Sequence, residues 1–197
     1  MAKRAFDILL SATGLLFMLP IMILIIMTIF IDDRGPAFFK QKRIGLNMQP
    51  FTLYKFRSMT VNKSSSGGSF DPGNQSRVTR IGKLLRKTKL DELPQLFNVL
   101  KGDMSIVGPR PEVKQYIEVY PERWAIVQKV KPGITDNASI EFRDEEEILV
   151  KSQNPEKTYI EEILPRKLKF YEQYVIAHSF LGDLKIIFKT IYVILSK

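Results

Sequence analysis

An uncharged run near the N-terminus limits what this chain can be more than any other feature. From Ile8 to Ile31, about two dozen residues carry no charged side chain. One straight helix of that length would measure roughly 36 Å, and the hydrocarbon core of a bilayer is about 30 Å thick. A cleaved signal peptide fits poorly, because the run is too long and no small-residue cleavage site ends it. The segment is therefore expected to lie in a membrane.

Pro20 stands almost at the centre of this run. Proline removes a backbone donor and clashes with the carbonyl of Leu16, so it kinks or breaks the helix, and each half is roughly 18 Å long. Basic residues on both flanks favour the cytoplasmic side. A re-entrant helix-break-helix hairpin, entering and leaving through one leaflet, satisfies both flanks. A spanning anchor with a tolerated proline kink is the alternative.

Charge and composition narrow the function further. Thirty Lys+Arg against 21 Asp+Glu give a net charge of +9, which implies a polyanionic partner such as nucleic acid, an anionic membrane surface or a phosphorylated substrate. Zero cysteines exclude disulfides, thiolate zinc sites and a cysteine nucleophile. The single histidine, His178, is expected to be a packing or interface residue. Any chemistry must then rest on carboxylates, arginines, lysines and hydroxyls.

The remaining pattern predicts an α+β fold, mainly helical with a small sheet. The sequence predicts short extended segments at 38–39 and 51–57, a flexible polar loop at 62–74, and helices at 77–87, 91–100, 121–130, 155–174 and 180–195. The last helix is apolar but carries Asp183, Lys185 and Lys189. This pattern predicts an interfacial amphipathic helix in the membrane plane, with a buried core helix as the alternative. We expect a membrane hairpin at 1–34 and a catalytic domain at 35–197, together forming one functional unit.

Asp91 and Glu92 form an adjacent carboxylate pair at the start of a predicted helix. Taken alone, such a pair more often caps a helix than performs catalysis, because the helix dipole stabilises it. The surroundings are strongly basic, however, and Arg110 follows in a rigid Gly-Pro-Arg-Pro segment. Phosphate handling requires forked arginines and a carboxylate that holds Mg²⁺ or attacks phosphorus. The sequence therefore suggests a phosphate site, although the basic run could also face headgroups or solvent.

The segment KLLRKTKLDELPQLFNVLKGDMSIVGPRP, from Lys83 to Pro111, resembles the signature of the monotopic phosphoglycosyl transferases, a group of bacterial sugar transferases. Similar matches are KRAFDILLSATGLLFMLP, GPAFFKQKRIG, YKFRSMT and KPGIT, in the family's order over nearly the whole chain. The length resembles that of the small members, which contain only the catalytic domain.

This resemblance implies a mechanism and a set of site residues. Asp91 matches the nucleophile that attacks the β-phosphorus of a UDP-sugar and expels UMP, and Glu92 matches the second member of the dyad. The pair is expected to hold Mg²⁺. Arg86, Arg110 and Arg143 match arginines near the phosphates, and Pro20 matches the proline that breaks the hairpin.

The resemblance also implies the partners and the location. The expected acceptor is polyprenyl phosphate in its undecaprenyl form. The protein is expected in the bacterial inner membrane, with its active site on the cytoplasmic face. Membrane lipids are further partners, nucleic acid is not, and a homo-oligomer is compatible with the sequence.

One stretch departs from the common family pattern. After KPGIT, Asp136 begins DNASIEF, and an acidic run from Asp144 to Glu147 follows Arg143. Donor identity therefore stays open. Two other functions also stay open: a non-catalytic, membrane-anchored protein that binds anionic ligands, and an enzyme in which the lipid phosphate attacks the donor directly.

Overall fold

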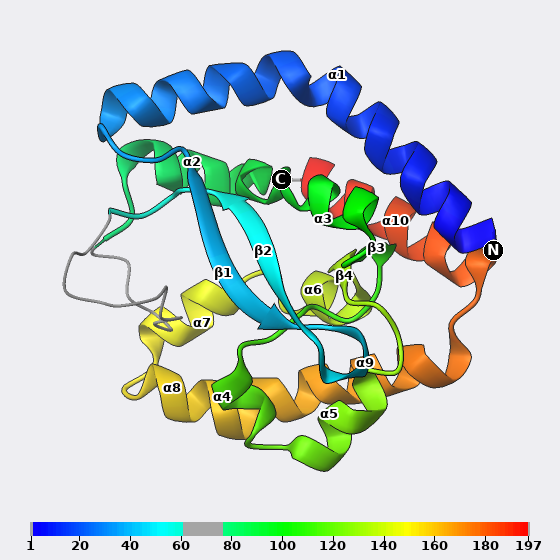
Figure 1. Ribbon diagram of the computed structural model, residues 1–197. Coiled ribbons are helices and arrows are strands. Elements are labelled where there is room, and N and C mark those ends of the chain that lie inside the picture. The colour runs from blue at the N-terminus through cyan, green and yellow to red at the C-terminus, as the bar shows by residue number, and fades with distance from the viewer. Residues whose placement is uncertain (1, 61–76, 197) are drawn as a thin grey trace.

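A long N-terminal helix arches over a mostly helical body that contains two small pairs of strands (Figure 1). This computed structural model describes residues 2–60 and 77–196; the loop predicted at 62–74 lies outside the described residues. The predicted fold class, mainly helical with little sheet, is confirmed.

Helix α1 runs from Ala2 to Asp32 as one continuous helix with Pro20 inside it. Figure 1 shows it bent near its middle, so the proline bends the helix without dividing it into two. Among the described residues α1 is the one helix long and apolar enough to cross a membrane, with a mean hydropathy of 2.8 in its most apolar window. Only 17% of that window is buried. The membrane re-entry of this helix stays a prediction.

Both ends of α1 are fastened to the same body. At the N-terminal end, Lys3 Nζ lies 2.5 Å from Asp183 Oδ2, and the buried carboxylate of Asp7 accepts the backbone N–H of Ile106 at 3.0 Å. Arg4 donates to two carbonyls at the end of α3. At the other end, Arg57 donates to Asp33 Oδ2 at 2.7 Å. The exposed apolar side chains of α1 lie between these two fastening points.

Strands β1 (Phe38–Ile44) and β2 (Pro50–Phe56) form an antiparallel hairpin, joined through a short 3-10 turn at Leu46–Met48. The two predicted extended segments are therefore confirmed, with β2 shifted by one residue. Leu53 and Phe56 of β2 are buried in two different core clusters, and Lys55 points to the opposite side of the strand from its neighbour Phe56.

The segment after the hairpin carries three short helical elements: α2 (Arg80–Thr88), η2 (Leu90–Glu92) and α3 (Gln95–Lys101). The prediction of one helix from 91 to 100 is wrong, because that stretch is divided. Lys89 adopts a left-handed conformation with φ 58°, which ends α2 and turns the chain sharply into η2. Pro94 then separates η2 from α3, since it has no N–H to continue the first turn.

A second pair of strands, β3 (Ser105–Val107) and β4 (Gly133–Thr135), is parallel and was not predicted. It requires a very close approach between two glycines. A Cβ atom on Gly133 would collide with the backbone of Gly108, and one on Gly108 would come within 2.5 Å of the carbonyl of Lys131. This contact fixes where the Gly-Pro-Arg-Pro segment leaves β3.

The remaining elements described are helical: α4 (Lys114–Ile117), α5 (Pro121–Val127), α6 (Asn137–Glu141), α7 (Glu145–Lys151), α8 (Pro155–Thr158), a π-helical turn η3 (Tyr159–Ile163), α9 (Leu164–Ala177) and α10 (Phe180–Leu195). The largest core cluster includes Trp124, Leu168 and Tyr171. The predicted helix at 155–174 thus exists, interrupted by the π-helical turn.

Helix α10 lies beside the N-terminal half of α1 (Figure 1). It buries Asp183 and Ile186 but exposes large apolar side chains, including Phe188 at 70% and Leu195 at 77%. The predicted helix at 180–195 is confirmed, and its interfacial placement stays a prediction.

Candidate active site

Asp91 and Glu92 lie on η2, between the left-handed residue Lys89 and the ring of Pro94. Lys89 turns the backbone just before the pair and Pro94 restricts it just after, so both carboxylates are held on a short segment. Asp91 is only 7% exposed. The two side chains are adjacent in sequence, yet their surroundings differ completely.

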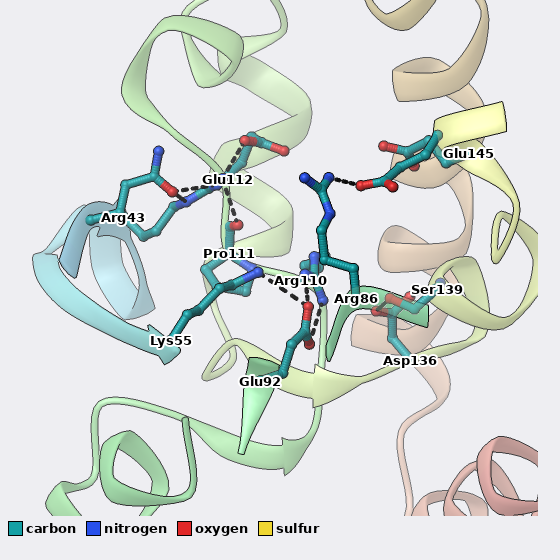
Figure 2. Close-up of polar contacts among 12 residues, drawn as sticks. Arg43, Lys55, Arg86, Glu92, Arg110, Pro111, Glu112, Asp136, Ser139 and Glu145 are labelled. Atoms are coloured by element: carbon teal, nitrogen blue, oxygen red, sulfur yellow. Dashed lines mark hydrogen bonds and ion pairs between the residues drawn. The ribbon is translucent and has the colours of Figure 1, made fainter. Parts of the chain in front are cut away.

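Glu92 is held by two cations. Lys55 Nζ lies 3.1 Å from Oε1, and Arg110 donates to both carboxylate oxygens, with Nη1 3.1 Å from Oε2 (Figure 2). Burial alone would raise the pKa of Glu92, but the charges of Arg110 and Lys55 outweigh it, and the pKa lies well below its ordinary value. Glu92 is therefore a permanent anion whose oxygens are already engaged.

Asp91 has no such partner. Its Oδ1 is buried and makes no hydrogen bond within the described part of the chain. Burial raises the pKa of Asp91; Lys55 opposes that change and the neighbouring charge of Glu92 adds to it. A buried carboxylate oxygen without a partner is costly, and a cation, a proton or a covalent bond would relieve that cost.

The cations around the pair are partly or fully withdrawn from solvent. Glu92 raises the pKa of Arg110 above its ordinary value despite burial, whereas burial lowers the pKa of Lys55 against the attraction of Glu92. Burial also lowers the pKa of Arg86, opposed by the charges of Asp91 and then Glu92. Arg86 therefore lies within electrostatic range of both carboxylates.

The whole chain, residues 1–197, matches the family model described as bacterial sugar transferase. The chain belongs to that family.

Three relatives illustrate the similarity. The UDP-glucose:undecaprenyl-phosphate glucose-1-phosphate transferase of Klebsiella pneumoniae is 38% identical over 194 residues, which cover 96% of this chain and 39% of that protein. The UDP-N-acetylgalactosamine-undecaprenyl-phosphate N-acetylgalactosaminephosphotransferase of Aeromonas hydrophila is 40% identical, over 70% of this chain and 33% of that protein. The sugar transferase EpsL of Bacillus subtilis is 45% identical, over 72% of this chain and 69% of that protein. The chain thus spans well under half the length of the first two.

The structure of this sugar transferase brings some of the predicted site residues together. Asp91, Glu92 and Arg110 form one cluster, and Arg86 reaches the edge of it. Arg143 points elsewhere: it donates to the carbonyl of Val193 in α10 at 3.3 Å, and its Nε lies 3.7 Å from Asp144. Pro20 lies in α1.

Lys55 is the site residue that the sequence analysis missed. It stands in the YKFRSMT segment, where alternation marked it only as a strand residue. Its side chain is 19% exposed and bonds Glu92. Strand alternation gives no signal for this role, because the contact with Glu92 joins segments 37 residues apart.

A second buried polar network lies next to the site, around Glu112. Glu112 accepts from Arg43 Nη1 at 2.6 Å (Figure 2). It also accepts from the hydroxyl of Tyr159 at 2.7 Å. Asp136 caps α6 by accepting from Ser139, and its charge is close enough to raise the pKa of Arg110. The contacts of Arg43 and Tyr159 hold the end of the Gly-Pro-Arg-Pro segment, next to Arg110, against β1 and η3.

The donor set fits Mg²⁺ in a limited way. No group of three or more His, Cys, Asp or Glu side chains gathers as a metal site within residues 2–60 and 77–196. Asp91 offers a free carboxylate oxygen, whereas the oxygens of Glu92 are occupied by Lys55 and Arg110. Mg²⁺ typically takes one or two carboxylates and completes its shell with water and substrate phosphates. Asp91 is thus suited to hold Mg²⁺ alongside a bound phosphate substrate.

Proposed function

We propose that this sugar transferase moves a phosphosugar from a UDP-sugar to polyprenyl phosphate, in its undecaprenyl form, through a covalent intermediate on Asp91. The observation that carries the proposal is the contrast within the dyad. Glu92 is neutralised by Arg110 and Lys55, while the neighbouring Asp91 keeps a buried oxygen that has no hydrogen-bond partner among the described residues. A carboxylate is ionised at neutral pH and needs no histidine to activate it, in keeping with a chain that contains one.

The first step forms a bond between Asp91 Oδ and the β-phosphorus of the donor. The bond from that phosphorus to the oxygen bridging to the α-phosphate breaks, and UMP leaves with the electron pair. In the second step an oxygen of the polyprenyl phosphate attacks the same phosphorus and restores the carboxylate of Asp91. The products are UMP and a polyprenyl diphosphate sugar.

The other residues orient and neutralise charge in this scheme. Transfer of phosphoryl groups depends mainly on alignment and on stabilising the spreading negative charge. Arg86 and Arg110 are the cations placed to contact the nonbridging oxygens, and Glu92 orients Arg110 and Lys55. Asp91 would hold Mg²⁺, which would further neutralise the charge of the diphosphate. Arg143 is a further candidate for phosphate binding, and its contacts in the structure are with Val193 and Asp144.

The fastening of α1 supports a membrane placement for this proposal. Both ends of this helix bind the same body, through Lys3 and Asp33, which favours a location of both ends on one side of the bilayer. We infer a shallow re-entrant insertion into the cytoplasmic leaflet of the inner membrane, with α10 at the interface. The phosphate of a lipid acceptor then meets Asp91 without withdrawal of its tail from the bilayer.

The decisive experiment incubates the purified protein with UDP-sugars alone. We expect one UMP per active site in a single burst, with the phosphosugar bound to Asp91 and detectable by mass spectrometry. Asp91→Asn should abolish both signals, while the exposed control Glu122→Gln should keep them. If UMP appears only after polyprenyl phosphate is added, the lipid attacks directly in a ternary complex. If no UMP forms with any donor and acceptor, the protein binds anionic ligands without catalysis.

A further inference from the structure

Arg86 is bound by a carboxylate from a distant part of the chain. Its guanidinium forms an ion pair with Glu146 of α7, sixty residues further along the sequence. Burial lowers the pKa of Arg86, and the charges of Asp91 and Glu92 oppose that change. An arginine within electrostatic range of Asp91 thus carries a carboxylate of its own.

This ion pair is weakly held. The side chain of Glu146 is 53% exposed and that of Arg86 is 28% exposed. Partly solvated pairs contribute little stability, because water competes for both charges. A phosphate carries more charge and three acceptor oxygens, and it suits the guanidinium fork at least as well as a carboxylate does.

Helix α7 does not depend on Glu146 for its position. The preceding residue, Glu145, pairs at 2.9 Å with Lys167, whose side chain is only 6% exposed. Leu149 is 2% exposed and belongs to the largest core cluster. When Glu146 releases Arg86, these two contacts keep the helix in place. The two neighbouring glutamates therefore have different roles.

We propose that Glu146 occupies the guanidinium of Arg86 while no donor is bound, and that the donor diphosphate displaces it. This inference rests on the proposed function. The carboxylate of Glu146 and a donor phosphate cannot both bind the guanidinium of Arg86. Once displaced, the carboxylate remains near the diphosphate and repels it, because both are negatively charged. Glu146 thereby lowers the affinity for the donor and speeds the departure of UMP, so it determines donor binding without touching the reacting atoms.

The test compares Glu146→Gln with the control Glu147→Gln. The control removes the same charge from the neighbouring residue, which is exposed and forms no ion pair with any described residue. We expect the KM for the UDP-sugar to fall about two- to fivefold in Glu146→Gln, with kcat unchanged or lower, and inhibition by UMP to strengthen by a similar factor. Glu147→Gln should change both values by less than that. An unchanged or raised KM in Glu146→Gln would overturn the proposal.

A second variant separates displacement from general charge effects. In an Arg86→Gln background, the additional change Glu146→Gln should no longer strengthen the binding of UMP, because the contested guanidinium is absent. The same gain in both backgrounds would contradict the inference. The proposed function is judged separately: a wild-type protein that gives no UMP burst refutes the covalent scheme, whereas a normal burst with a neutral Glu146→Gln refutes only the role of Glu146.

Discussion

Arg110 donates to both carboxylate oxygens of Glu92, eighteen residues before it in the chain. This fork ties the segment after β3 to the turn between α2 and α3. It also leaves Asp91 as the one member of the dyad with an oxygen free to react, since Lys55 adds a third contact to Glu92 and none is made to Asp91 Oδ1 in the described structure. Removing the charge of Asp91 and removing the charge of Glu92 should therefore change the stability of the protein in opposite directions.

Neutralising Asp91 should stabilise the protein while removing its activity. Because burial raises its pKa, the folded state binds a proton more tightly than the unfolded state, and this group costs stability once the pH rises through its folded pKa. We expect Asp91→Asn to increase the free energy of unfolding by on the order of 1 kcal/mol at pH 7. Thermal unfolding in detergent, beside Glu122→Gln, measures it. A lower unfolding temperature would contradict the assignment of a desolvated charge.

Neutralising Glu92 should destabilise the protein strongly. Glu92→Gln leaves Lys55 and Arg110 buried without their counter-charge, and breaking a buried pair in this way costs about 3–5 kcal/mol. The pKa of Glu92 is depressed in the folded state, so its contribution is complete above the ordinary glutamate pKa and is lost as the pH falls through the folded value. Denaturant unfolding measures the free energy of unfolding of wild type and Glu92→Gln at pH 7 and at pH 3. The difference between the two proteins should be smaller at pH 3.

The two ends of α1 should be accessible from the same side of the membrane. The chain contains no cysteine, so Ala2→Cys and Arg34→Cys each introduce one labelling site at an exposed position. In spheroplasts, neither should react with an impermeant maleimide, and in inverted vesicles both should. Labelling of the two positions from opposite sides would replace the shallow insertion with a spanning anchor.

Removing the proline should change that result. Pro20→Ala restores a backbone donor and removes the clash with the preceding turn, which favours a straight helix by about 3 kcal/mol. A straight α1 is long enough to cross the bilayer, so the Ala2→Cys label should become accessible from outside in part of the molecules. Pro36→Ala, outside the helix, is the matched control. If Pro20→Ala keeps both ends inside, the fastening at Lys3 and Asp33 determines the topology without help from the bend.

Local patterns predicted the elements whose side chains repeat with a clear period. The apolar run predicted α1, and alternation predicted β2. The parallel pair of β3 and β4 was missed because three-residue strands show no period and depend on the approach of Gly133 to Gly108. The single helix expected at 91–100 was wrong because the left-handed turn at Lys89 and the break at Pro94 override the apolar stripe.

The site residues that belong to a sequence motif could be predicted. Those that only the fold brings to the site could not. Asp91, Glu92 and Arg110 follow from the resemblance to the family. Lys55 comes from another strand, and its role depends on the pairing that turns it toward Glu92. The partnership of Arg86 with Glu146 joins segments sixty residues apart, and the acidic run of α7 gave no indication of its partner.

The ion pair between Lys3 and Asp183 spans 180 positions of the chain. During synthesis Lys3 leaves the ribosome 180 residues before Asp183, the residue that secures it. The apolar helix must therefore meet the lipid, or a factor that shields it, before this attachment exists. Assembly is then ordered in time: bilayer contact comes early, and closure of the loop between Lys3 and Asp183 follows.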